Sequence, residues 1–243
     1  MRKIIALFIT IIFLGGCASA PMRTNSQFAS YFHEPGVEKT ITVMPIDIKF
    51  YKLTAGGVSE QMDEWDIQSD ALFRQAIIDR LDPSARIKVT VLEDKDIGSE
   101  FKKFLDEENG LYRAVSTSII NHTFTPYNAF PQKVKEFDYT LGPDLNNFTK
   151  FKDADALLFL SGSRTYWTGG RVALAAWGIA LGAVTGVAVT PGSVLDWVST
   201  ALVDVKTGNV LWFKYVSKVG DLRNKGAVRS TVNYLFSDLD TKK

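Results

Sequence analysis

One stretch, residues 172–195, holds no charged side chain, although charged residues make up 23% of the chain. A continuous apolar run, Leu157–Leu160, precedes it and is typical of a buried strand. Two β-rich runs follow it and flank Lys206–Asn209, where Gly208 can take the positive φ of a tight structural turn. We therefore expect the order strand, apolar insertion, hairpin.

Glycines recur every four residues in this insertion, at Gly178, Gly182 and Gly186. On a helix this spacing makes a groove where another backbone can approach. The pattern favours a helix over residues 172–190 that packs on the sheet or on a second copy of the chain. Two alternatives remain: a buried core helix, and a membrane contact, since residues 172–195 have the length of a membrane-spanning helix but an alanine- and glycine-rich, weakly apolar composition.

The N-terminus combines Arg2 and Lys3 with a short apolar run that ends at Leu14, a signal-peptide pattern over residues 1–16. Leu14-Gly15-Gly16-Cys17 resembles the lipobox of bacterial lipoproteins. The resemblance implies cleavage after Gly16 and acyl chains on Cys17, the only cysteine. Ala18, where an inner-membrane retention signal has Asp, implies the outer membrane, facing the periplasm. The alternative is a soluble secreted protein with an incidental cysteine.

Composition argues against several classes of function. The formal net charge of +1 becomes −1 once residues 1–16, with Arg2 and Lys3, are removed, and no basic run indicates nucleic-acid binding. His33 and His122 stand far apart, and with one cysteine they predict no metal or cofactor site. Ser161 and Ser163 follow a strand without the glycine that precedes a nucleophile elbow. We expect no enzyme and identify no small-molecule substrate.

The rest of the chain reads as alternating strands and helices. We expect a lipidated tether over 17–38, a periplasmic domain over 39–243, and a strand over 39–48 disturbed at Pro45. Further expected elements are a strand over 48–53, a helix over 66–81, a strand over 87–92, a helix over 99–109 ended by Gly110 and resuming over 111–120, and helices over 144–152 and 228–239.

Two clusters have alternative interpretations. The acids Glu60, Asp63, Glu64 and Asp66 around Trp65 suit helix capping more than cation binding or acid–base chemistry. The aromatic, proline-rich segment 121–143 is either a loop packed on the domain or a surface for a partner, and we favour the packed loop.

This order of elements predicts an α/β (α+β) fold, a mixed sheet with helices packed on it and an Ala/Gly-rich helical insertion. Three patches, Thr40–Ile46, Asp153–Leu160 and Leu202–Trp212, resemble periplasmic lipoproteins with a TolB-N-like domain. That group includes the curli-secretion channel lipoproteins and the lipoprotein activators of penicillin-binding proteins. The resemblance implies a non-enzymatic envelope scaffold, assembly or secretion accessory that binds an envelope protein or forms a homo-oligomer. The alternatives are a subunit of an oligomeric outer-membrane secretion channel and, less favoured, an envelope hydrolase.

Overall fold

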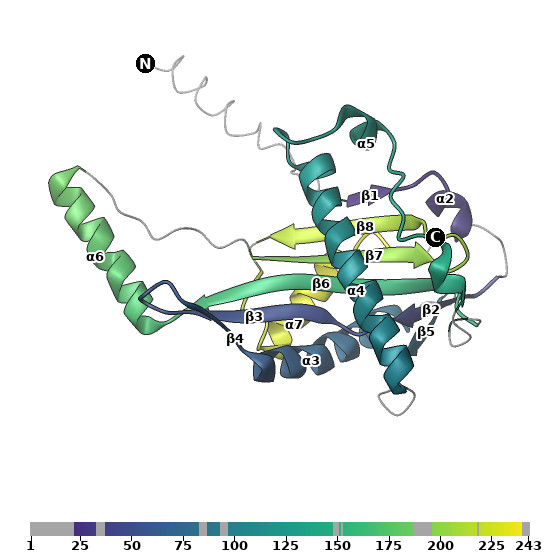
Figure 1. Ribbon diagram of the computed structural model, residues 1–243, viewed down its shortest axis with the longest axis horizontal. Helices are drawn as coiled ribbons and strands as arrows, with labels where there is room; N and C mark the ends of the chain where they lie inside the picture. Colours follow the sequence, from purple (N-terminus) through teal and green to yellow (C-terminus); the bar gives the residue numbers. More distant parts are fainter. Residues whose placement is uncertain are drawn as a thin grey trace, which may run out of the picture.

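A computed structural model describes residues 22–32, 37–82, 87–92, 97–147, 151, 153–186, 196–217 and 219–239. Its centre is one mixed sheet with the strand order β1-β8-β7-β6-β2-β5, and the β3–β4 hairpin also pairs with β6 through β3 (Figure 1). The strands are β1 Met22–Thr24, β2 Lys39–Val43, β3 Asp47–Leu53, β4 Ser59–Gln61, β5 Ile87–Val91, β6 Ala156–Trp167, β7 Trp197–Asp204 and β8 Val210–Ser217. The predicted mixed sheet is confirmed.

The long strand β6 organises this sheet. On one side it pairs in parallel first with β2 and then with β3, and on the other it pairs antiparallel with β7. The strand predicted over 39–48 is therefore two strands, with Pro45 in the break between them. Proline has no N–H to donate to a ladder, which explains why pairing stops there.

Helices cover both faces of the sheet (Figure 1). Their bounds are α2 Phe28–Tyr31, α3 Asp63–Leu81, α4 Ser99–Ile119, α5 Pro131–Lys135, α6 Gly169–Thr185 and α7 Lys225–Leu235, with a π-helical turn at Ile120–Phe124 and a 3-10 turn at Pro143–Asn147. Successive side chains of β6 enter opposite cores: Leu158 and Leu160 pack with α3 and α7, whereas Leu157 and Phe159 pack with α4. This alternation makes a three-layer α/β/α body.

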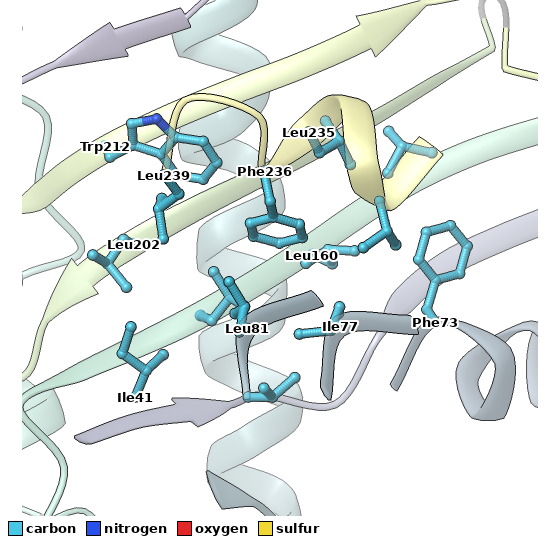
Figure 2. Packing of buried hydrophobic residues seen from close by; sticks show 14 of the residues in the cluster. Ile41, Phe73, Ile77, Leu81, Leu160, Leu202, Trp212, Leu235, Phe236 and Leu239 are labelled. Carbon is cyan, nitrogen blue, oxygen red and sulfur yellow. The ribbon is translucent and has the colours of Figure 1, made fainter. Parts of the chain in front are cut away.

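The core between the sheet, α3 and α7 is the one in Figure 2. Phe73, Ile77 and Leu81 recur at four-residue spacing along α3 and point toward Leu235 and Phe236 at the end of α7. All of them are almost completely buried. The 3.6-residue period of α3 therefore defines its buried side.

Helix α4 differs from the expected pair of helices. Gly110 lies inside one continuous helix and does not end it. Leu105, Tyr112 and Ile119, on either side of Gly110, are buried in the same core. Burial along this face outweighs the roughly 1 kcal/mol helix penalty of one glycine.

The segment predicted to be a tether, residues 17–38, contributes to the body. β1 pairs with β8, so that Met22 lies opposite Lys214 and Thr24 opposite Trp212. In α2, Phe28 and Tyr31 pack against the core cluster. Part of the predicted tether is thus a strand and a helix of the body, and β1 starts five residues after Cys17 in the sequence.

Candidate interaction surface

Helix α6 stands off from the rest of the molecule at the end of β6 (Figure 1). Among its described side chains only Ala175 is buried, while Trp177 is 68% exposed. Other exposed apolar side chains on this helix are Val172, Leu174, Ile179 and Val184. The predicted insertion is helical up to Thr185, but it does not form a buried helix under the sheet.

The base of α6 is fixed to the β3–β4 hairpin. Thr168 donates its N–H to the Leu53 carbonyl at 3.0 Å, and its own carbonyl accepts the Val172 N–H at 3.0 Å, the first bond of the helix. The Arg171 guanidinium lies 5.5 Å from the centre of the Trp167 ring and donates to the Thr54 carbonyl. The helix therefore leaves the sheet from a defined point.

The chain returns from the insertion at Asp196, which is also held in place. Its carboxylate pairs with Arg164 and accepts the Thr165 N–H at 2.8 Å, both on β6. Both ends of the insertion therefore lie at β6: its start follows β6 directly at Thr168, and its end is bonded to β6 through Asp196. Sequence reasoning missed these contacts because the partners are separated by about thirty positions and follow no short motif.

The three glycines singled out by their spacing have different positions. Gly178 and Gly182 lie within α6, whereas Gly186 follows its last residue with φ +75°. A left-handed glycine just after a helix is a common C-terminal stop. Residues 187–190 of the predicted helix lie outside the described residues, and a packing role for the glycine face stays a prediction.

The aromatic segment 121–143 is largely a packed loop. Phe137 and Tyr139 are buried, and Phe124 packs at 5.2 Å on the Tyr215 ring of β8. At its tip, however, Tyr127 is 98% exposed and Phe130, stacked on His122 at 4.1 Å, is half exposed. The packed-loop interpretation therefore holds for most of the segment, whereas the tip presents exposed aromatic side chains.

The β7–β8 hairpin holds this loop in place. Gly208, with φ +70°, accepts bonds at its carbonyl from the Leu141 N–H at 2.8 Å and the Thr140 hydroxyl at 3.1 Å. The Val210 N–H donates to the Tyr139 carbonyl at 2.9 Å. The predicted turn is confirmed, and its role is structural in two ways, since it also docks the aromatic segment.

The predicted capping bond is absent from the acidic cluster, but Asp63, Glu64 and Asp66 lie in the first turn of α3, where the helix dipole favours acids as expected. Met62 occupies the N-cap position of α3, and no side chain caps the helix. Asp66 instead accepts the Phe50 N–H of β3 at 2.8 Å. In the described part of the chain no three His, Cys, Asp or Glu side chains are grouped to hold a metal ion.

Beside the acidic cluster, Arg223 lies over the rings of both Trp65 and Tyr166, 4.7 Å and 4.1 Å from their centres. Asp221 accepts from Arg223 and from the Tyr166 hydroxyl, the latter at 2.7 Å. The hydrogen bond from Arg223 holds the pKa of Asp221 well below its usual range. The Asp221–Arg223 ion pair and the two rings that it contacts therefore join the start of α3 to the loop before α7.

The two serines considered as nucleophiles, Ser161 and Ser163, lie within β6 and do not follow a strand as expected. Ser161 is fully buried, and its hydroxyl is 3.4 Å from that of Ser199, which also bonds the Tyr112 hydroxyl at 3.0 Å. Burial raises the pKa of Tyr112. His122 contacts the Asn128 carbonyl through its Nδ1, and His33 lies outside the described residues. The arrangement is that of a buried hydroxyl network.

Cys17 also lies outside the described residues, but β1 shows from which end the chain enters the sheet. β1 runs antiparallel to β8, with Met22 nearer than Thr24 to the β8 residue Ser217. Ser217 pairs with Trp197 at the start of β7, and β7 is the strand that follows the insertion. Met22 therefore points toward the end of the sheet that carries α6. No helix in the described part of the chain is long and apolar enough to cross a membrane.

Comparison with known proteins adds distant similarities to solved structures. No family model and no curated protein matches the chain. A PelC dodecamer structure from Paraburkholderia phytofirmans is 14% identical, with 85% of this chain and 90% of that chain covered and a TM-score of 0.35. Lipoprotein GNA1162 from Neisseria meningitidis is 12% identical (83% and 97% covered, TM-score 0.31), and the LpoB C-terminal domain from Salmonella enterica is 11% identical (78% and 90%, TM-score 0.27). At these values none of the similarities assigns a function.

Proposed function

We propose that the protein is a lipid-anchored accessory protein of the bacterial envelope, which acts as a scaffold for other proteins and does not catalyse a reaction. The observation that carries the proposal is the short distance in sequence between Cys17 and β1. Five residues of fully extended chain reach at most about 18 Å. An acylated Cys17 would therefore keep the whole α/β body next to the membrane. Ala18 supports the outer membrane, on its periplasmic side.

Two features support contact with a partner over catalysis. Ser161 is bonded into the sheet interior, where it packs and does not face solvent. Tyr127 and Phe130, by contrast, are presented on a loop that is fastened to the β7–β8 hairpin. Exposed rings on a fixed support provide contact area at low entropic cost.

A subunit of an oligomeric secretion channel is the second candidate. The exposed apolar surface of α6 favours it, because a subunit of a membrane channel needs an apolar surface that lipid covers. The size of the detergent-extracted protein by light scattering distinguishes the two: a monomer supports the scaffold, and a closed oligomer supports the channel subunit.

The direct test begins with the intact mass of protein extracted from membranes. We expect an N-terminus at Cys17 that carries acyl chains, and an unmodified N-terminus at another residue would refute the anchor. A photo-reactive phenylalanine analogue at position 127 then reports partners in intact cells. The matched control is position 103, where Lys103 is exposed on polar α4 surface. We expect a discrete adduct with an envelope protein at 127 and none at 103. Equal labelling at both positions would refute the contact surface.

A further inference from the structure

We propose that α6 is a second membrane contact, which inserts into the surface of the same lipid leaflet that holds the acylated Cys17. The inference rests on the proposed anchor for the choice of membrane, but α6 itself is tested without it. The occupant of this surface is lipid and not a second copy of the chain. Three observations lead to this assignment.

The first observation is that α6 is apolar on all sides. A helix turns about 100° per residue, so Val172 and Ile179 share one side while Leu174 and Trp177 lie nearly opposite. All four are more than half exposed. Contact with a second protein would cover one stripe of the helix and leave the other in water. A lipid environment covers the sides together, which is the usual setting of a helix that is hydrophobic all round.

The second observation is the composition at the base of the helix. Arg171 is the only charged residue between Arg164 and Asp196, and it lies over the Trp167 ring where α6 leaves the sheet. An aromatic ring beside a cation is the pairing expected at the boundary between water and lipid, where the ring meets the headgroups and the cation meets phosphate. The polar boundary thus falls at the point where the body ends and the apolar helix begins.

The third observation is the direction of the anchor. Met22 points toward the α6 end of the sheet, and an extended chain from Met22 to Cys17 reaches at most about 18 Å. An anchor on Cys17 would therefore lie toward the end of the sheet that carries α6. Seventeen helical residues measure about 25 Å, which is too short to span the hydrocarbon core of about 30 Å and longer than the half of it that one leaflet provides. We therefore place α6 strongly tilted within one leaflet.

The test uses the mature chain, residues 17–243 with Cys17→Ser, which retains every described residue but carries no lipid. The probe is a vesicle of phosphatidylethanolamine and phosphatidylglycerol, three to one. We expect the protein to sediment with these vesicles and the tryptophan emission to shift to shorter wavelength. Trp177→Phe should remove most of that shift, because Trp177 lies on the inserted helix.

A matched pair of charge substitutions distinguishes insertion of α6 from non-specific binding of the protein to vesicles. Leu174→Asp places a carboxylate on α6 and should lower vesicle binding about tenfold or more, since a charge is costly in lipid. Ile67→Asp makes the same change at a 73%-exposed apolar residue of α3 and should leave binding unchanged. Circular dichroism of both variants checks that they fold.

Each outcome decides the proposal. Wild-type binding that is no stronger than that of Leu174→Asp, or an equal loss in Ile67→Asp, would overturn it. The proposal would also be overturned if the wild-type protein does not bind vesicles and forms a lipid-free oligomer that Leu174→Asp converts to a monomer. A second copy of the chain would then be the occupant of the α6 surface. An N-terminus of the cellular protein other than acylated Cys17 would refute the anchor alone and leave vesicle binding by α6 as a separate result.

Discussion

Replacing Gly208 by alanine tests how the hairpin and the aromatic segment depend on each other. A Cβ at Gly208 would lie 1.8 Å from the carbonyl oxygen of Gly142, whereas ordinary contacts begin near 3.4 Å. The backbone at Gly142 must therefore move by about 1.6 Å or the hairpin must open. The bonds from Leu141, Thr140 and Val210 that join the two segments span this junction.

The expected cost has two parts. A non-glycine residue at φ +70° costs about 1 kcal/mol. Loss of two of the junction's hydrogen bonds adds about 2 kcal/mol, at about 1 kcal/mol each. We expect Gly208→Ala to lower the free energy of unfolding by about 3 kcal/mol in total.

Gly57 provides the matched control. Its φ is +84°, but a Cβ there would meet nothing within 4 Å, so Gly57→Ala should cost only the conformational part, about 1 kcal/mol. Urea unfolding of residues 17–243 with Cys17→Ser, followed by fluorescence and far-ultraviolet circular dichroism, measures both variants. Equal losses in the two would refute the reasoning, since the clash with Gly142 would then contribute nothing.

Two further predictions concern the cores. Phe73→Ala removes a fully buried ring between α3 and the sheet and should cost about 3–5 kcal/mol in the same urea assay, whereas Ile67→Ala on the exposed side of that helix should change stability by less than about 0.5 kcal/mol. Burial, with the nearby Asp144 and Glu107 carboxylates, raises the pKa of Glu108 to about 7. The folded protein then binds more protons than the unfolded chain between about pH 4.5 and 7, so stability should fall as pH rises through that window, by at most about 3 kcal/mol. Glu108→Gln should flatten this part of the stability–pH curve, and an unchanged slope would show that another group causes it.

Local patterns in the sequence were sufficient to predict most of the sheet and its helices. The apolar run Leu157–Leu160 predicts a buried strand, and the glycine of the β7–β8 turn predicts a tight turn. Each of these signals lies within a few neighbouring residues, so the sequence shows it directly. Gly110 alone predicts a helix end, because this local signal does not include the buried face that extends across it. The residues of β1 likewise predict a tether, because the partner strand β8 is almost two hundred positions away.

The candidate surface was less predictable than the fold. The uncharged composition of residues 172–195 marks the insertion, but composition is the same for a buried helix and an exposed one. Only the positions of Thr168 and Asp196 on the sheet determine that α6 leaves the body. The exposure of the tip residues Tyr127 and Phe130 could not be predicted either, because other aromatic residues of the same loop are buried.

The pairing of β6 with β2 and β3 has a consequence for how the chain folds. β2 and β3 lie in the first quarter of the sequence, and both need a partner strand that begins only at Ala156. β1 needs β8, which is later still. Contacts between such distant segments must first overcome the entropy of closing long loops, which slows folding. A chain with this topology stays without its central sheet until most of it has been made.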